Sequence, residues 1–189
     1  MPEKDGNAMH EKRFEGNIDR LRFPERLARL EVERVVGLCL EPGPVENMLD
    51  VGTGTGVFAE AFAQRGLPVS GVDVNPEMLS ASRRFVPAGD FRLGTAEALP
   101  FPDGSFDLVF LGFVLHESDD PLTSLQEAMR VARKRVCIQE WPYRVQPFGP
   151  PITDRLNPVG LADLFKKAGF QKWTTTDLVH TAFYCLSIP

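Results

Sequence analysis

The sequence has no excess of basic residues. Its 189 residues include 26 acidic and 21 basic side chains, which gives a formal net charge of −5 at pH 7. A protein that binds nucleic acid needs a basic face to neutralise phosphates, so this composition argues against a nucleic-acid partner. The two densest basic runs, RRF at 83–85 and RKR at 133–135, are interpreted as solvated ends of helices.

Long apolar runs are also missing. The longest nearly continuous one, LVFLGFVL at 108–115, is far shorter than the roughly 20 residues that a membrane-spanning helix requires. The first twenty residues are charged and lack the apolar core of a signal peptide. We therefore expect a soluble, cytoplasmic protein that has no membrane partner.

Cysteine is scarce, and so are groups of residues that bind metals. Cys39, Cys137 and Cys185 are odd in number and far apart in the sequence, and no CxxC pair or Cys/His cluster with zinc spacing is present. We expect three reduced cysteines in the core and no metal site. His10 and His180 have no neighbours that suggest a catalytic pair.

What the sequence does have is an alternation of short apolar segments and amphipathic segments. A helical pattern begins at Pro24 and stops at EPGP, residues 41–44. Further helices are predicted at 57–66, 75–85, 119–134 and 159–170, and strands at 46–51, 68–74, 91–99, from Phe106, and at 135–143, 171–179 and 181–188. This alternation predicts an α/β fold with a mostly parallel sheet, helices on both faces, and a C-terminal antiparallel hairpin.

No repeat or linker divides the chain, so we expect one domain over residues 1–189. Within it we distinguish a helical cap segment (1–44), a core (45–141), a Pro-rich loop (142–158), and a C-terminal helix and hairpin (159–189).

The stretch MLDVGTGTG, residues 48–56, places glycines at 52, 54 and 56 directly after a predicted strand. Glycine at this density indicates a tight turn or a close approach of the backbone to a ligand. Ligands of such sheets bind beyond the carboxyl ends of the strands. A phosphate-binding P-loop is excluded, because Val57 and Phe58 follow where Lys and Ser or Thr would stand, and the spacing differs from the dinucleotide pattern GxGxxG.

Two carboxylates narrow the choice of ligand. Asp50 precedes the glycines, where it would repel a pyrophosphate but suits a cationic ligand. Asp73 ends the second strand, where it can accept hydrogen bonds from two ribose hydroxyls. Taken alone, Asp50 is also compatible with a strand-end acid and Asp73 with a helix cap. Together with the glycines they favour a ligand that has a ribose, a positive charge and no pyrophosphate, as S-adenosylmethionine does.

Four stretches in this order resemble a known family: MLDVGTGTGVFAEAFAQRG, GVDVNPEMLSASRR, GTAEALPFPDGSFDLVF and VLHESDDPLTSLQEAMRVARK. Over about residues 45–141 the sequence is similar to the class I, Rossmann-like S-adenosylmethionine-dependent methyltransferases. Within them it resembles the small-molecule group of the ubiquinone and menaquinone methyltransferases. The resemblance implies a doubly wound, seven-stranded sheet and S-adenosyl-L-methionine as the cofactor.

The resemblance also implies which residues bind that cofactor. The methionine part would be lined by the glycine turn and by the end of the fourth strand, the ribose by the end of the second strand, and the adenine by the segment after the third. The residues concerned are Asp50, Gly52, Thr53, Gly54, Gly56, Asp73, Val74, Asn75, Met78, Thr95, Ala96, Glu97, Leu111, Gly112 and Phe113.

The sequence departs from the family pattern at two places. Thr95 stands where the family often has a carboxylate that contacts the adenine, and its hydroxyl can still accept one hydrogen bond. The usual Pro-Gly-Gly turn is missing before the fifth strand, which RKRV enters directly.

The acceptor side is less determined. His116 and Glu117 are the nearest candidate acid or base groups, and Tyr143 and Arg144 open the Pro-rich loop; His116, Tyr143 and Arg144 are our candidates for contacts with the substrate. Packing at a helix start for His116, and a solvated loop for the other two, are alternative interpretations. Residues 8–23 and the Pro-rich loop are predicted to cover the substrate, which we expect to be a small and rather apolar molecule, and a second subunit can complete the site in a homodimer.

The predicted reaction is transfer of a methyl group to an unidentified small-molecule acceptor by in-line displacement. A non-catalytic regulator that binds S-adenosylmethionine remains an alternative, as does an enzyme that transfers the aminocarboxypropyl group of the same cofactor. A nicotinamide-dependent oxidoreductase is opposed by the GxGxG spacing and by Asp50.

Overall fold

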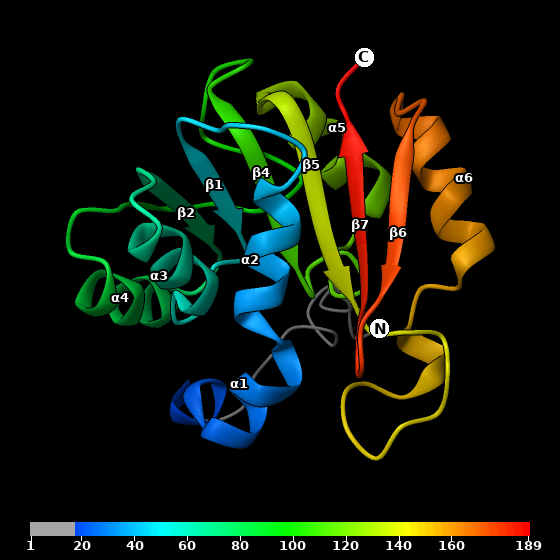
Figure 1. Cartoon of the computed structure of the whole chain (residues 1–189), viewed down its shortest axis with the longest axis horizontal. Coiled ribbons are helices and arrows are strands. Elements are labelled where there is room, and N and C mark those ends of the chain that lie inside the picture. The colour runs from blue at the N-terminus through cyan, green and yellow to red at the C-terminus, as the bar shows by residue number, and fades with distance from the viewer. Residues whose placement is uncertain (1–17) are drawn as a thin grey trace, which may run out of the picture.

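The computed structural model describes residues 18–189, and the predicted α/β architecture is confirmed (Figure 1). Seven strands form one sheet in the order β3-β2-β1-β4-β5-β7-β6. All pairings are parallel except those of β7, which runs antiparallel to β5 and β6. The strands are β1 Met48–Val51, β2 Val69–Asp73, β3 Asp90–Leu93, β4 Phe106–Gly112, β5 Ala132–Glu140, β6 Trp173–Asp177 and β7 Ala182–Ser187.

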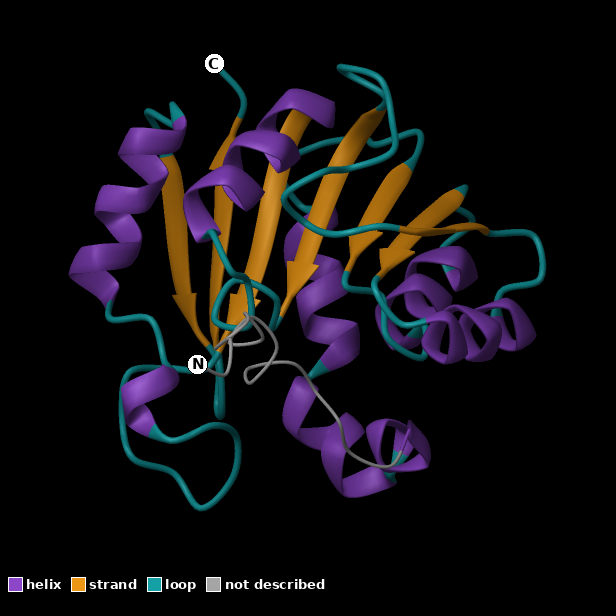
Figure 2. Ribbon diagram, turned by 180° about the vertical axis from the view of Figure 1, so that it is seen from behind, coloured by secondary structure: helices purple, strands orange, loops and turns teal. Residues whose placement is uncertain are grey.

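Helices cover both faces of the sheet. The helices are η1 Ile18–Arg22, α1 Pro24–Leu30, α2 Val32–Leu40, α3 Val57–Gln64, α4 Pro76–Phe85, α5 Pro121–Val131, η2 Ile152–Asp154 and α6 Pro158–Ala168. Buried side chains of α2, α3 and α4 form one core cluster with the sheet, and those of α5 and α6 form the other, on the face turned to the viewer in Figure 2. None of the helices described between residues 18 and 189 is long and apolar enough to cross a membrane.

Short polar side chains cap the N-termini of two helices. The side chain of Asn75 accepts a hydrogen bond from the backbone of Glu77 at 2.8 Å, and Pro76 takes the first helical position of α4. Asp120 caps α5 in the same way, through the backbone N–H of Leu122 and Thr123 at 3.0 and 3.2 Å. These caps satisfy backbone donors that have no partner within the helix.

The N-terminal helical pattern is interrupted, which the sequence does not predict. Glu31 adopts a left-handed conformation with φ of 48° and separates α1 from α2. Its carboxylate accepts hydrogen bonds from the backbone N–H of Val179 at 2.7 Å and from Arg34 at 3.0 Å. This long-range contact with the β6–β7 turn accompanies a conformation that costs energy in a non-glycine residue.

The interpretation of RKR at 133–135 as a helix end is wrong, because these residues lie in β5. Arg133 and Lys134 form ion pairs with Asp107 at 2.7 and 2.9 Å, and Arg135 is buried and donates hydrogen bonds to backbone carbonyls before β1. The charged run can enter the sheet because each cation finds an acceptor there. RRF at 83–85 does lie at the end of a helix, α4, with exposed side chains.

The three cysteines are free and buried, as predicted. They are far apart in the sequence but share one core cluster, in which Cys137 of β5 lies opposite Cys185 of β7, and Cys39 comes from α2. Burial raises the pKa of the Cys137 thiol well above its ordinary value, so this group stays protonated and unreactive.

Candidate functional site

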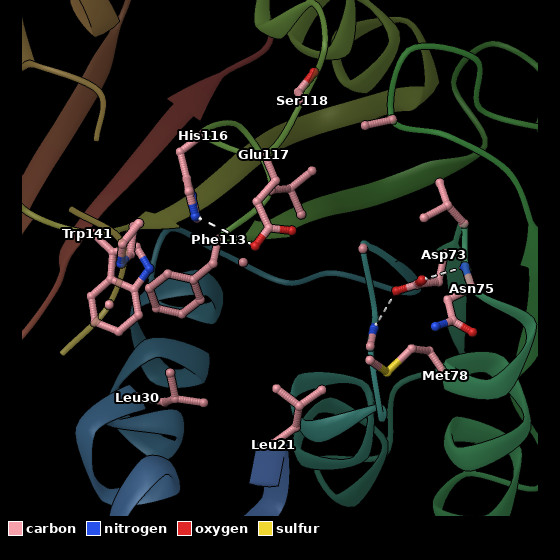
Figure 3. A pocket seen from close by; sticks show the side chains of 18 of the residues that line it. Leu21, Leu30, Asp73, Asn75, Met78, Phe113, His116, Glu117, Ser118 and Trp141 are labelled. Carbon is pink, nitrogen blue, oxygen red and sulfur yellow. Dashed lines mark hydrogen bonds and ion pairs between the residues drawn. The ribbon is translucent and has the colours of Figure 1, made fainter. Parts of the chain in front are cut away.

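A cavity of about 730 Å³ opens at the carboxyl ends of β1, β2 and β4. In the sheet, β2 and β3 lie on one side of β1, and β4 and β5 lie on the other. The strand order therefore reverses between β1 and β4, and the cavity lies at this switch point. Figure 3 shows Asp73, Asn75 and Met78 on one side of it, and Phe113, His116 and Trp141 on the other. Residues of η1 and α1 also contribute to its wall.

The glycine turn after β1 needs its glycines for two different reasons. Gly52 has φ of 65°, and a Cβ atom there would collide with the Cγ2 atom of Val114, which itself lines the cavity. Gly56 has φ of 77°, and a Cβ atom would lie 3.1 Å from the Cα atom of Ser82 in α4. Gly52 therefore allows the segment after β4 to pack closely against the turn, and Gly56 allows α4 to do so. Gly54 between them has φ of 54° and lines the cavity.

The carboxylate of Asp73 is fixed by the backbone on both sides. One oxygen accepts a hydrogen bond from Gly54 N–H at 2.8 Å, and the other accepts one from Asn75 N–H at 2.9 Å. The residue also lines the cavity. A carboxylate held in this way by two backbone donors has a defined position relative to any molecule that enters.

Asp50 is buried beneath the glycine turn and does not line the cavity, although the sequence predicts it among the cofactor contacts. Its carboxylate accepts a hydrogen bond from the Thr53 hydroxyl at 2.8 Å. Burial raises the pKa of Asp50 to about 7, against the lowering effect of the hydrogen bonds from Thr53 and the Ala59 backbone, and the nearby charge of Asp73 adds to the rise. Asp50 therefore supports the turn from beneath and does not contact the cavity.

The segment after β3 is tied to the start of α5 by one carboxylate. Glu97 accepts hydrogen bonds from the Ser118 hydroxyl at 2.5 Å and from the backbone N–H of Asp119 at 3.1 Å. Glu97 and Ala96 line the cavity, whereas Thr95 forms an isolated bridge with Ala98 and does not. The connection from β3 to β4 contains no helix, and this carboxylate helps to hold it in place.

Beyond β4 the chain forms an aromatic wall. Phe113 has φ of 63°, which is unusual for a residue other than glycine, and its N–H donates to the Gln139 carbonyl at 2.8 Å. The ring centroid of Phe113 lies 4.8 Å from that of Trp141, which follows β5. Strained residues of this kind are frequent at binding sites, where the surrounding structure keeps them in place.

His116 and Glu140 form a buried pair at the same end of the cavity. The Nδ1 atom of His116 lies 2.8 Å from Oε2 of Glu140, and both residues are less than one-tenth exposed. Its Nε2 atom lies 3.7 Å from Oε1 of Glu117, and both His116 and Glu117 line the cavity. Burial lowers the pKa of His116, but the charge and hydrogen bond of Glu140, with the charge of Glu117, raise it more, so the pKa lies above its ordinary value.

The cover over the cavity comes partly from the N-terminal segment. Of the predicted cover at 8–23, residues 8–17 lie outside the described part of the chain. Arg22 fastens the rest to the glycine turn: it donates to the Thr55 carbonyl at 2.8 Å, pairs with Glu60 at 2.7 Å, and lies over the Phe85 ring. Helix α1, which the sequence does not predict as part of the site, also lines the cavity; the arginines spaced along 20–29 are a signal that points to it.

The Pro-rich loop forms the opposite rim, and one arginine holds it. Arg155 is buried and donates to the carbonyls of residues 142, 144, 148 and 150 and to the side chain of Gln146, at 2.8–3.1 Å. Gly149, Pro150 and Asp154 reach the cavity. Tyr143 is half exposed and Arg144 donates to the Val179 carbonyl at 2.8 Å; neither is part of the cavity wall as the described residues form it.

The structure thus gathers most of the sequence-predicted residues around one cavity. The predicted residues on its wall are Gly52, Gly54, Asp73, Val74, Asn75, Met78, Ala96, Glu97, Gly112, Phe113 and His116, and those that are not part of it are Asp50, Thr53, Gly56, Thr95, Leu111, Tyr143 and Arg144.

Comparison with known proteins agrees with this arrangement. Residues 49–137 match the model of a methyltransferase domain. The chain is 38% identical over 109 residues to a demethylmenaquinone methyltransferase of Renibacterium salmoninarum, an alignment that covers 57% of this chain and 45% of that protein. It is 36% identical over 101 residues to a malonyl-[acyl-carrier protein] O-methyltransferase of Serratia marcescens, covering 53% and 39%. The chain spans about half the length of the curated relatives it matches or less.

Solved structures share the fold over nearly the whole chain. A SAM-dependent methyltransferase from Aquifex aeolicus superposes with a TM-score of 0.80 and 25% identity, covering 91% of this chain and 97% of that one. Magnesium protoporphyrin IX methyltransferase from Synechocystis, with bound SAH, has the same fold, with a TM-score of 0.70, 17% identity, and coverage of 87% and 85%. The chain therefore contains a methyltransferase domain over residues 49–137 and is similar to S-adenosylmethionine-dependent methyltransferases, among them the demethylmenaquinone methyltransferases.

Proposed function

We propose that this chain binds S-adenosyl-L-methionine and transfers its methyl group to a small molecule. The observation that carries the proposal is the Asp73 carboxylate, which two backbone N–H groups hold on the cavity wall beside the glycine turn. A fixed carboxylate is suited to the two hydroxyls of a ribose. Its place in one cavity with His116 and Glu117 supports an enzyme over the alternative of a regulator that only binds the cofactor.

The residues on the cavity wall offer a contact for each part of such a cofactor. We propose that Asp73 holds the ribose, that Val74, Asn75, Met78 and Ala96 flank the adenosine, and that Gly52, Gly54, Gly112 and Phe113 border the methionine part. Asp50, Thr53 and Gly56 would act from beneath the turn by fixing its backbone. The sulfonium of the cofactor supplies a methyl group with an activated leaving group, so the protein contributes mainly position.

The pair formed by His116 and Glu140 gives the acceptor side a base. Because Glu140 engages Nδ1 at 2.8 Å, the neutral ring carries its proton there and presents the lone pair of Nε2. We propose that Nε2 accepts a proton from the reacting atom of the acceptor, while Glu140 stabilises the resulting imidazolium. The acceptor would then carry an O–H or N–H group, or an acidic C–H group, at the atom that is methylated.

The names of the relatives give two different kinds of methyl acceptor, and they do not determine the acceptor of this chain. One relative acts on demethylmenaquinone and another on malonyl-[acyl-carrier protein]. The aromatic wall of Phe113 and Trp141 supports a partly apolar acceptor. Cytoplasmic location, the lack of a nucleic-acid partner, a single domain, and a homodimer that completes the acceptor side remain predictions from the sequence.

The proposal is tested first by binding. Calorimetry of the purified protein should show micromolar-range binding of S-adenosylmethionine and of S-adenosylhomocysteine, and no binding of NAD. A folded protein that binds neither adenosyl compound would refute the proposed function. Incubation with methyl-labelled S-adenosylmethionine and a small-molecule cell extract then separates enzyme from regulator. Label in a small molecule supports the enzyme, whereas binding without any transfer supports the regulator.

A further inference from the structure

Arg26 lies on the cavity wall, and residues 18–189 supply no hydrogen-bond acceptor for its side chain. It lies in α1, its side chain is largely buried, and its Nε atom is buried without a hydrogen bond. No carboxylate of residues 18–189 lies within ion-pair distance of its guanidinium, and none of its N–H groups donates a hydrogen bond within that part of the chain. Guanidinium groups have five donors, so this leaves a large hydrogen-bonding capacity unused.

The charges around Arg26 do not compensate for its burial. Burial lowers the pKa of Arg26, the charge of Glu117 raises it to a smaller degree, and Arg29, one turn further along α1, lowers it again. The guanidinium of Arg29 lies 4.9 Å from the Phe148 ring and also lines the cavity. The part of the cavity wall that α1 forms therefore holds two cations, and the charge of one of them, Arg26, is poorly compensated.

Two other arginines, the half-buried Arg22 and the buried Arg155, show what is unusual about Arg26. Arg22 pairs with Glu60 and with the Thr55 carbonyl, and Arg155 is surrounded by five acceptors. Burying a charge is costly unless it is paired and hydrogen-bonded. The described residues satisfy Arg22 and Arg155 fully but provide no acceptor for Arg26, so a molecule in the cavity can supply one.

We infer that Arg26 binds a carboxylate of a molecule held in the cavity. A guanidinium presents parallel N–H groups whose spacing matches the two oxygens of a carboxylate. Glu25, Glu117 and Asp154 also line the cavity, and these acids would repel a doubly charged phosphate more strongly than a singly charged carboxylate. This inference rests on the proposed function, and it allows two sources for the carboxylate: the amino-acid end of the methyl donor or an acid group of the acceptor.

The first arm of the test asks whether the donor supplies the carboxylate. Calorimetry compares S-adenosylhomocysteine with 5′-methylthioadenosine, which keeps the adenosine and the thioether but lacks the amino-acid carboxylate. If the donor supplies it, Arg26→Met weakens binding of S-adenosylhomocysteine by roughly 10- to 100-fold and changes that of 5′-methylthioadenosine less than about twofold. Arg84→Met, an exposed arginine at the end of α4, is the matched control and should change neither.

The second arm asks whether the acceptor supplies it. In protein with and without saturating S-adenosylhomocysteine, the ¹⁵Nε resonance of Arg26, assigned by its loss in Arg26→Met, is followed while benzoate is added. A saturable shift with benzoate that persists in the protein saturated with S-adenosylhomocysteine, and none with the neutral benzamide, assigns the carboxylate to the acceptor. Arg26→Gln serves as a second variant in both arms in case the methionine substitution disturbs the fold.

A purely structural role for Arg26 gives a different result. Removal of an unpaired buried cation should leave the melting temperature of the ligand-free protein unchanged or raise it, whereas loss of a structural arginine lowers it. The inference is overturned if Arg26→Met lowers that temperature by several degrees, or if neither S-adenosylhomocysteine affinity nor the benzoate response depends on Arg26. If the wild type binds neither adenosyl compound, the proposed function fails, and the benzoate arm without cofactor still decides the role of Arg26.

Discussion

The carboxylate of Asp73, at the end of β2, accepts a hydrogen bond from the backbone N–H of Gly54 at 2.8 Å. This bond joins the second strand of the sheet to the glycine turn after the first, 19 residues earlier in the chain. The N-cap of α4 is Asn75 and not Asp73, so the carboxylate is not needed to start the helix. Its two roles are to hold the turn and to face the cavity.

Substitution of Asp73 by Asn should weaken cofactor binding. The amide has one acceptor oxygen instead of two, and its NH2 group would face a backbone N–H of Gly54 or Asn75. We expect a loss of about 1.5–3 kcal/mol in the binding free energy of S-adenosylhomocysteine, measured by calorimetry. Asp177→Asn, at the exposed end of β6, is the control. An unchanged affinity in a folded Asp73→Asn protein would mean that the ribose is bound elsewhere.

The stability of the ligand-free protein should fall as the pH rises from about 4 to about 7 because of Asp50. Its pKa is raised to about 7 in the folded protein by burial, so in this range the folded state holds a proton that the unfolded state has lost. The expected decrease in the free energy of unfolding from this group is at most about 4 kcal/mol. Urea unfolding of the wild type and of Asp50→Asn at pH 5 and pH 8 isolates the contribution of Asp50, because all other titratable groups are common to both proteins. Equal pH dependence in the two proteins would show that Asp50 is ionised in the fold throughout.

The rate of methyl transfer should fall at low pH through protonation of His116. Only the neutral ring accepts a proton, and its pKa is raised because Glu140 and Glu117 outweigh both burial and the charge of Arg155. The acid limb of the rate profile should therefore lie above the ordinary histidine value, and Glu140→Gln should move it to lower pH. His116→Ala should lose about 10²–10⁴-fold in rate.

Measurement of the ring itself separates this role from packing. Titration of the His116 imidazole by NMR in the wild type and in Glu140→Gln should give the same displacement as the two rate profiles. His180→Ala is the control, because that ring lies against Phe148 outside the described cavity wall. A rate profile that does not follow the measured titration would exclude His116 as the base.

Arg155 should control the order of the Pro-rich loop. Arg155→Met removes five hydrogen bonds of 2.8–3.1 Å from the segment between residues 142 and 150, and we expect a loss of about 2–4 kcal/mol in stability. Limited proteolysis with mass spectrometry should show new cleavage in this loop, while urea unfolding measures the stability. Arg144→Met removes one exposed hydrogen bond, and the protease should cleave this variant at the same sites as the wild type. Equal protection of both variants would show that the prolines alone hold the loop.

Local features of the fold could be predicted from the sequence because they depend on neighbouring residues. Asn75 with Pro76, and Asp120 with Pro121, start helices through caps within three positions of the chain. The glycine turn was located by its spacing after an apolar strand. The break at Glu31 and the strand position of Arg133 were missed, because a contact with Val179 and one with Asp107 accompany them, and both partners are remote in sequence.

The sequence by itself determined the layered α/β fold, the glycine turn and the acids that identify the cofactor class, because these are periodic patterns and short motifs with a direct physical cause. Only the tertiary structure decided that Glu140 faces His116, that Asp50 stays behind the turn, and that Arg26 lines the cavity with its Nε unpaired among residues 18–189. Those relationships depend on which strand ends and helix faces meet in space, and on burial, which changes the energy of a charge in a way that no local pattern records.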